Sequence, residues 1–251
     1  RQMTTDLMGF DALNYNVVYA QMGRGKTERI VADAMASIAA TMAKLAQDVC
    51  LYISQNFGFV SLPDNLTTGS SIMPHKKNPD VFELIRAKCN KLAVLPQQIA
   101  MITANLPSGY HRDLQIIKED FLPAFEDLKN CLAITKYMLE NMKVNPDAVK
   151  DERYRYMFSV EVVNQLVLEG TSFRDAYRKV GEDIAAGNYE PSLSVHHTHE
   201  GSIGNLCNKE IEELMQQTLK SFGFEKTHLA LNKLLTDDTD FVKQEHNQLN
   251  T

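Results

Sequence analysis

The feature that most constrains this chain is a stretch of 31 residues, from Lys26 to Asn56, that contains neither glycine nor proline. Its larger apolar residues recur every three or four positions, at Val31, Met35, Ile38, Met42, Leu45, Val49 and Ile53. That spacing places them on one face of an α-helix. The helix would be about 46 Å long at a rise of about 1.5 Å per residue. Such a length is typical of a bundle whose helices cross between subunits.

Two further helices are predicted from the same kind of spacing. The first follows Pro79 and carries Val81, Leu84, Ile85, Cys89 and Leu92. We expect Pro96 to kink or end it, because proline lacks a backbone donor. The second carries Phe121, Phe125, Leu128, Leu132, Leu139 and Met142, with the polar Thr135 between them and an expected bend at Pro123. Three long amphipathic helices predict an all-α fold built on a long-helix bundle.

The chain changes character near Asn145 and Pro146, a helix cap followed by proline at the first helical position. The predicted helices that follow are shorter, at 159–168, 172–186 and 210–222, and each ends near a glycine. We therefore predict two domains. Residues 1–144 form part of a central helical bundle domain that carries a loop at 67–80, and residues 145–251 form a small C-terminal helical domain.

Composition narrows the classes of function. The chain has 26 basic and 32 acidic residues, a net charge of −6, which argues against nucleic acid or an anionic membrane as a partner. No run of 18 apolar residues could span a bilayer. The four cysteines form no CxxC pair, so neither a zinc knuckle nor a compact disulfide scaffold is predicted, and a reducing, cytoplasmic setting fits best.

Two apparent motifs are given structural interpretations. Gly25-Lys26-Thr27 resembles the end of a phosphate-binding loop, but Ala20 stands where that loop requires glycine, so we interpret it as a helix N-terminus. A second cluster consists of His196, His197, His199 and Glu200. No spacing there holds two imidazoles on one helix face, so we predict a solvated loop and no metal site.

Residues 67–80, with the sequence TTGSSIMPHKKNPD, carry the most specific pattern in the chain. Proline at 79 disfavours helix at Asn78 and suits the first position of the helix that follows. The loop therefore ends at a helix N-terminus, where backbone donors and the helix dipole favour an anion. Lys76 and Lys77 add positive charge beside it. The arrangement predicts a site for a carboxylate or for a developing oxyanion.

The stretch from Gly69 to Pro79 resembles the signature of the aspartase/fumarase superfamily, Gly-Ser-Ser-x-Met-Pro-x-Lys-x-Asn-Pro, at every fixed position. Residues 77–88, KNPDVFELIRAK, are similar to its argininosuccinate lyase branch. So is the block 110–118, with its tyrosine, Asp-Leu-Gln and lysine, and residues 172–181 resemble the C-terminal helical domain of that branch. The resemblance reaches from about residue 10 to residue 181.

The resemblance implies a carbon-nitrogen lyase that splits argininosuccinate into arginine and fumarate, the last step of arginine biosynthesis, without metal or organic cofactor. The site residues that it implies are the catalytic Ser70, Lys76 and Asn78 and the substrate-binding Tyr110, Gln115 and Lys118. Ser70 matches the position of the general base, and a hydroxyl needs a lowered pKa to act in that way. Lys76 and Asn78 suit the charge that gathers on the substrate carboxylate.

The resemblance also implies a homotetramer whose active sites combine loops from three subunits. Members of the family place before these residues a first domain, a Ser-Arg-Asn substrate loop and a Thr-His motif that supplies the acid, and none of these occurs in this sequence. We therefore expect the chain to be the C-terminal portion of its polypeptide. We expect it to be inactive without the N-terminal part.

Some positions depart from the pattern of the branch and leave alternatives open. His75 stands where the branch more often has glutamine and is similar to the adenylosuccinate lyase branch, which is the alternative enzyme. Residues 16–27 match the branch's Asp-Arg-Asp stretch loosely, with Arg24 in the place of its arginine. A non-catalytic structural relative, of the kind found among lens proteins, is a third possibility. The retained site residues disfavour it, because packing alone has no need of them.

Overall fold

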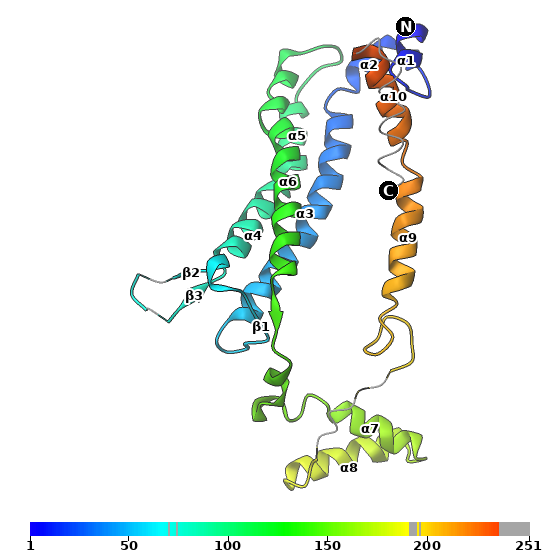
Figure 1. Ribbon diagram of the computed structural model, residues 1–251. Helices are drawn as coiled ribbons and strands as arrows, with labels where there is room; N and C mark the ends of the chain where they lie inside the picture. Colours follow the sequence, from blue (N-terminus) through cyan, green and yellow to red (C-terminus); the bar gives the residue numbers. More distant parts are fainter. Residues whose placement is uncertain (70, 74, 191–194, 196, 236–251) are drawn as a thin grey trace. The chain divides into compact units, whose positions relative to one another are not determined.

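The computed structural model describes residues 1–69, 71–73, 75–190, 195 and 197–235. Its regular structure is almost entirely helical, with two pairs of two-residue strands (Figure 1). The all-α prediction is confirmed. The chain divides into two compact units, one of residues 16–154 and one of residues 1–15 together with 155–251. Our assignment of 1–144 and 145–251 as domains stays a prediction.

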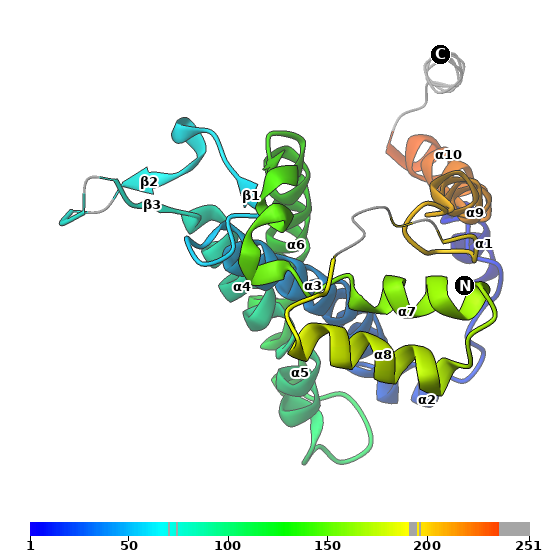
Figure 2. The same ribbon diagram turned by 90° about the horizontal axis from the view of Figure 1, so that it is seen from below.

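The unit of residues 16–154 is a bundle around one long helix. Its α-helices are α2 (Val17–Met22), α3 (Lys26–Ile53), α4 (Asp80–Leu92), α5 (Leu95–Thr103) and α6 (Ile117–Glu140). The long helix α3 packs against α4, α5 and α6 (Figures 1 and 2). With 28 residues it is three shorter at its C-terminal end than the sequence indicated.

The start of α3 depends on a glycine. Gly25 caps the helix with φ +82°, a left-handed conformation that glycine adopts without strain. Its N–H donates to Glu28 Oε2 at 2.8 Å. A Cβ placed on Gly25 would lie 2.5 Å from Thr103 Cγ2, so the absence of a side chain also lets this turn approach α5. The interpretation of Gly25-Lys26-Thr27 as a helix N-terminus is confirmed.

The core face of α3 only partly coincides with the stripe that its larger apolar residues mark. Small side chains dominate the buried set, which is Ala32, Met35, Ala39, Met42, Ala43, Ala46 and Val49. Two members of the predicted stripe, Ile38 and Leu45, are exposed. Alanines allow the backbone of α4 to come close, and α4 contributes the fully buried Phe82 and Cys89. The predicted stripe thus contributes Met35, Met42 and Val49 to the core and Val31 and Ile53 to its edge, and the prediction is wrong for Ile38 and Leu45.

A similar correction applies to α6. Its buried residues are Ile117, Ala124, Leu128, Cys131, Thr135 and Met138. Of the predicted stripe, Leu128 is buried, whereas Phe125, Leu132 and Leu139 are exposed. The polar Thr135 therefore lies in the core. A helix that is apolar on two faces has no single stripe for periodicity to identify.

Prolines mark the helix ends. Pro96 lies in the first turn of α5, so α4 ends at Leu92 and a new helix begins, as expected of a proline that cannot continue a helix. Pro79 is the cap residue of α4, one position before the first helical residue, Asp80. The long α6 continues through Pro123.

Short strands and 3₁₀ turns connect the helices. Strand β1 (Val60–Ser61) pairs antiparallel with β4 (Lys143–Val144), and β2 (Thr68–Gly69) pairs antiparallel with β3 (Lys77–Asn78). The 3₁₀ turns are η1 (Asp64–Leu66), η2 (Arg112–Gln115), η3 (Pro146–Lys150) and η4 (Glu152–Tyr154).

The other unit contains α1 (Gln2–Leu7), α7 (Ser159–Leu168), α8 (Phe173–Ala185), α9 (Asn208–Lys220) and α10 (Phe224–Leu235). Helices α7 and α8 lie side by side and share a small core of Val163, Ala176, Val180 and Tyr189 (Figure 2). Ser172 caps α8 by accepting from the N–H of Asp175. The three helices predicted here correspond to α7, α8 and α9, with ends displaced by at most two residues.

Candidate active site

The signature segment folds as a hairpin next to the bundle. We call residues 68–78 the signature hairpin; Ser70 and Pro74 lie outside the described residues. Its strands pair Thr68 with Asn78 and Gly69 with Lys77. The hairpin extends from the end of the bundle where α3 ends and α4 begins (Figure 1). The predicted base, Ser70, therefore has no described geometry, whereas Lys76 and Asn78 do.

Two side-chain contacts join the base of the hairpin to the segments on either side. Thr68 Oγ1 donates to Asp80 Oδ2 at the start of α4. Lys77 Nζ forms an ion pair with Asp64 Oδ1 in η1. The structure thereby distinguishes the two neighbouring lysines by their ion-pair partners. Lys77 has a carboxylate partner, and Lys76 has no carboxylate within salt-bridge distance in the part of the chain that the structure describes.

Lys76 and Asn78 line an open groove of about 750 Å³, which we call the signature groove. Its remaining wall comes from the last turn of α3, the segment after it, the hairpin and the first turns of α4. The lining residues are Cys50, Ile53, Ser54, Gln55, Val60, Ser61, Leu62, Thr67, Met73, His75, Lys76, Lys77, Asn78, Pro79 and Glu83. The groove is large enough for a dicarboxylate substrate, and its charged lining residues are Lys76, the ion-paired Lys77 and Glu83.

Cys50 is the thiol in the wall of this groove. Burial raises the pKa of Cys50, Arg86 opposes that shift, and the nearby Glu83 adds to it. The thiol therefore stays protonated near neutral pH, where only a thiolate would be a strong nucleophile. Cys50 is therefore not suited to act as a nucleophile in this groove.

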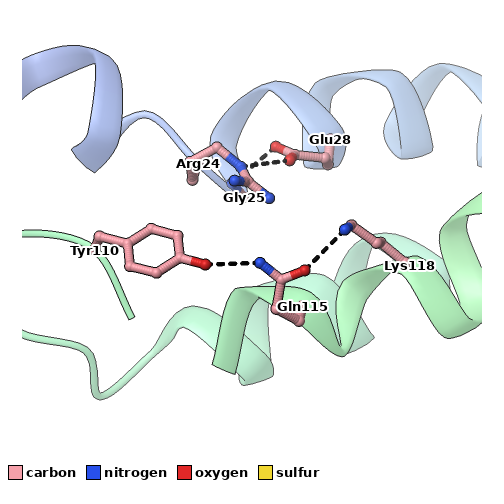
Figure 3. Close-up of polar contacts among 6 residues, drawn as sticks. All are labelled: Arg24, Gly25, Glu28, Tyr110, Gln115 and Lys118. Carbon is pink, nitrogen blue, oxygen red and sulfur yellow. Dashed lines mark hydrogen bonds and ion pairs between the residues drawn. The ribbon is translucent and has the colours of Figure 1, made fainter. Parts of the chain in front are cut away.

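The predicted substrate-binding residues are brought together between α5 and α6. Gln115 Nε2 donates to the Tyr110 hydroxyl oxygen at 2.8 Å, and Lys118 Nζ donates to Gln115 Oε1 at 2.8 Å (Figure 3). Two buried neighbours, Leu114 and Ile117, anchor the turn that carries them. The glutamine amide thus holds the phenol with one end and the ammonium with the other. The spacing of five and three residues in the sequence corresponds to a real cluster.

Arg24 adds a second cation at this end of the bundle. Its Nε lies 3.2 Å from Glu28 Oε1, and Figure 3 shows the pair across from Gln115 and Lys118. Arg24 also lines a cavity of about 150 Å³ with Gly109 and other residues of the α5–α6 connection. Leu114, next to Gln115 in the sequence, lines the same cavity; the match of Arg24 to the arginine of the Asp-Arg-Asp stretch stays a prediction.

The two groups of predicted site residues lie at opposite ends of α3. Arg24 precedes its first residue, whereas Cys50 and Ile53, in its last turn, line the signature groove. A helix of 28 residues is about 42 Å long. Lys76 and Asn78 are therefore not brought together with Tyr110, Gln115 and Lys118 within one chain.

The histidine-containing segment adopts a different role from the one expected. His197 Nε2 lies 3.0 and 3.1 Å from the two carboxylate oxygens of Glu161 in α7, and the His199 ring stacks on the His197 ring at 5.5 Å. The interpretation as a solvated loop is thus wrong for His197; His196 lies outside the described residues. Among the residues that are described, no three histidine, cysteine or acidic side chains are grouped to hold a metal ion.

Sequence reasoning missed three residues around the signature. Asp64, Thr68 and Asp80 fasten the hairpin, yet none was singled out beforehand. The only available signal was their position just outside the glycine and the Asn-Pro pair. The partners are 12 and 13 residues apart and belong to different elements, so no periodicity connects them.

Comparison with known proteins identifies similar sequences over most of the chain. A family described as Lyase matches residues 25–93. A curated argininosuccinate lyase of Parabacteroides distasonis is 65% identical over 235 residues, which cover 94% of this chain and 53% of that protein. One of Bacteroides thetaiotaomicron is 68% identical over 224 residues, which cover 89% and 50%. The chain thus spans about half the length of the curated relatives it matches.

Solved structures share the fold at much lower identity. An EDDS lyase in complex with formate has a TM-score of 0.58 and 21% identity over 74% of this chain and 38% of its own. A class II fumarase from Schistosoma mansoni has a TM-score of 0.60 and 16% identity over 86% and 42%. These likenesses show a common helical-bundle fold. No helix within the described ranges has the length and apolar character needed to cross a membrane.

Proposed function

Because this chain belongs to the argininosuccinate lyase family, we propose that it is part of an enzyme that splits argininosuccinate into arginine and fumarate. The observation that carries the proposal is the hydrogen-bonded series Tyr110–Gln115–Lys118. Each of these residues matches a substrate-binding position of the family, and the three side chains meet. Argininosuccinate is rich in carboxylates, for which the Lys118 ammonium is a natural partner.

The reaction is an elimination that needs a base and a stabilised anion. The base removes a proton from the carbon next to a carboxylate, and the electron pair left on that carbon spreads into the carboxylate. The pair then forms the double bond of fumarate as the carbon-nitrogen bond breaks, and the nitrogen leaves as arginine after gaining a proton. We assign the base to Ser70, which lies outside the described residues.

Lys76 and Asn78 are suited to the anionic stage of this reaction. Both line the signature groove. A cation and an amide donor that face the substrate carboxylate stabilise the additional charge that it gains in the transition state. With no carboxylate partner among the described residues, the Lys76 ammonium is not neutralised before substrate binds. We therefore assign charge stabilisation to Lys76 and Asn78.

We further infer that complete active sites form between copies of the chain, as in a homotetramer. The separation of the two groups along α3 supports this, because one substrate cannot reach both ends. Exposed apolar residues on the long helices, Ile30, Ile38 and Leu45 on α3 and Phe125, Leu132 and Leu139 on α6, provide a surface for such an assembly. We infer a cytoplasmic location from the four free cysteines.

We also propose that the general acid comes from the half of the relatives' length that this chain does not span. A chain limited to residues 1–251 would then bind substrate weakly and release no fumarate. In this proposal the activity requires a chain that spans the full length of the relatives.

The test follows fumarate absorbance when the full-length protein is mixed with argininosuccinate, and separately with adenylosuccinate. We expect fumarate from the first substrate, and loss of turnover in Ser70→Ala. Turnover of adenylosuccinate alone would replace the substrate assignment, since His75 is the residue that favours it. Activity on neither substrate would favour the non-catalytic alternative, and unchanged turnover in Ser70→Ala would remove Ser70 as the base.

A further inference from the structure

The signature hairpin has few backbone pairings of its own to define its strand register. Its ladder is two residues long on each side and includes Gly69. Short, glycine-containing pairings specify register weakly, and a slip of one residue exchanges the faces on which side chains lie. A slip that placed Lys76 opposite Gly69 would move Lys76 into the position that Lys77 occupies. Lys77 would at the same time move opposite Thr68, into the position that Asn78 occupies.

Two side-chain contacts at the base of the hairpin oppose such a slip. Thr68, on the first strand, donates to Asp80, which follows the second strand. Lys77, on the second strand, pairs with Asp64, which precedes the first. Each strand is thus tied to the segment that flanks the other strand. Both contacts are made in the register that pairs Thr68 with Asn78 and Gly69 with Lys77.

Both carboxylates are held by anchored elements. Asp80 begins α4, whose next turn buries Phe82 and Ile85 in the bundle core. Asp64 begins η1, which follows the buried Leu62 and ends at Leu66, a residue packed against the same core. The contacts with Asp64 and Asp80 therefore attach the hairpin to the bundle, although the hairpin's own residues are mostly exposed.

We propose that Asp64 and Asp80 are positioning residues that hold the signature hairpin in register, Asp64 by binding Lys77 and Asp80 by binding Thr68. Lys76 is thereby the lysine left for the substrate. Asp64 additionally pairs with Lys77, which leaves Lys76 without a carboxylate partner among the residues that the structure describes. The statement about the hairpin stands on the contacts alone, and the statement about substrate rests on the function proposed above.

The first experiment measures the hairpin without reference to activity. Limited trypsin cleavage within residues 76–78 is followed by mass spectrometry in the full-length protein, in Thr68→Val, in Asp80→Asn and in the double variant. We expect each single variant to be cleaved about fivefold faster, since a lost hydrogen bond allows more frequent opening. The double variant should be no faster than the faster single variant, because the same contact is already lost.

Asp64→Asn should raise the same cleavage rate about two- to fivefold, a smaller effect because the ion pair is exposed and screened by solvent. Its matched control is Asp147→Asn, which breaks the exposed Lys150–Asp147 ion pair away from the hairpin and should leave the cleavage rate unchanged. If the double variant were cleaved faster than either single variant, by the product of the two increases in rate, Thr68 and Asp80 would act independently and their contact would be refuted. Equal rates in Asp64→Asn and its control would overturn the role of Asp64.

The second experiment measures fumarate formation by the same variants. We expect kcat to fall about tenfold in Thr68→Val and in Asp80→Asn with little change in KM, because a displaced Lys76 stabilises the transition state less than it did. Thr68→Ser, which keeps the hydroxyl, should restore kcat. If the cleavage rates change as expected but the unmodified protein forms no fumarate, the proposed function is refuted. The role of Asp64 and Asp80 in holding the hairpin's register would still stand. Unchanged kcat in an active enzyme whose hairpin opens faster would refute the link to Lys76.

Discussion

At the scale of single residues, the candidate site is built from side chains that hold one another. Gln115 is the clearest case, since its amide oxygen accepts from Lys118 and its amide nitrogen donates to Tyr110. An amide is the side chain that can serve a donor and an acceptor at once. It orients the ammonium without adding a charge that would neutralise it. Glu28 has the corresponding role for Arg24 but does contribute a negative charge.

Gln115→Ala should therefore weaken substrate binding more than it slows chemistry. We expect KM for argininosuccinate to rise about tenfold, the effect of losing one charge-assisted hydrogen bond and the orientation of Lys118. Steady-state fumarate formation by the full-length enzyme measures this. Gln97→Ala, which changes an exposed glutamine on α5, is the control and should leave KM unaltered. A KM for Gln115→Ala equal to that of the control would show that the series does not bind substrate.

Cys89 gives the bundle a defined response to alkaline pH. Its side chain is fully buried in α4, and burial, with the nearby Cys131 adding to the effect, raises the pKa of Cys89 to about 12. The folded protein therefore retains this proton at pH values where the unfolded chain, with a pKa near 9.0, has lost it. The stabilisation is complete below the unfolded pKa and declines as pH rises from there toward the folded value.

We expect the free energy of unfolding to fall by about 1 to 2 kcal/mol more in the original protein than in Cys89→Ala when pH is raised from about 8 to about 10.5. Urea unfolding at the two pH values measures the difference. The cavity that Cys89→Ala creates lowers stability at both pH values and cancels in the comparison. An identical pH dependence in the two proteins would mean that Cys89 ionises normally in the fold.

At the scale of elements, helices approach each other closely where their contact surfaces carry small side chains or none. Alanines on α3 let α4 approach along the length of the contact. At the start of α3 the same function falls to Gly25, which faces Thr103 of α5 and holds a left-handed conformation. The turn before α3 thus connects the helix start to the end of the bundle that carries Arg24 and Lys118.

Gly25→Ala should destabilise the protein by about 2 to 4 kcal/mol, the sum of a strained φ and a contact that forces Thr103 to move. Gly58→Ala is the matched control, since Gly58 has φ +60° and nothing lies within 4 Å of the place that its Cβ would take, so that only the conformational strain remains. Thermal and urea unfolding measure both. Thr103→Ala should partly rescue Gly25→Ala. Equal losses in the two glycine variants would exclude the contact with Thr103.

At the scale of the whole molecule, the length of α3 separates the two halves of the predicted chemistry. The signature groove lies at its C-terminal end, and the Tyr110–Gln115–Lys118 series lies near its N-terminal end. The apolar residues left exposed on α3 and α6 offer surfaces through which copies could bring opposite ends together. An enzyme built in this way has sites that belong to the assembly.

Mixed assemblies test this arrangement. Lys76→Met and Lys118→Met should each be inactive alone, yet unfolding and refolding the two full-length variants together should restore part of the activity. Some sites would then draw Lys76 from one chain and Lys118 from another, with both intact. Lys76→Met mixed with Asn78→Ala is the control and should stay inactive, because every hairpin carries one defect. Recovery of fumarate formation only in the first mixture is expected; its absence would place both groups in one chain's site.

Much of this protein was determined by sequence alone. An uninterrupted run of 31 residues with helical spacing has one stable outcome, and the positions of Pro96 and Gly25 indicated where helices end and begin. In the block 110–118, Tyr110, Gln115 and Lys118 were implied only by the resemblance to the lyase branch, and the structure adds that their side chains are hydrogen-bonded to one another. Local geometry follows from local sequence whenever the partners are only a few residues apart.

Only the tertiary structure decided which faces of the helices form the core and which lysine of the signature is paired. Helices α3 and α6 are apolar on two faces, so the choice depended on which face could approach a neighbour most closely, and the alanines and Thr135 went inside. Lys76 and Lys77 are chemically identical, and only the carboxylate of Asp64, 13 residues from Lys77, distinguishes them. Such contacts join segments whose distance in space no sequence period encodes, and they form only when the chain is folded.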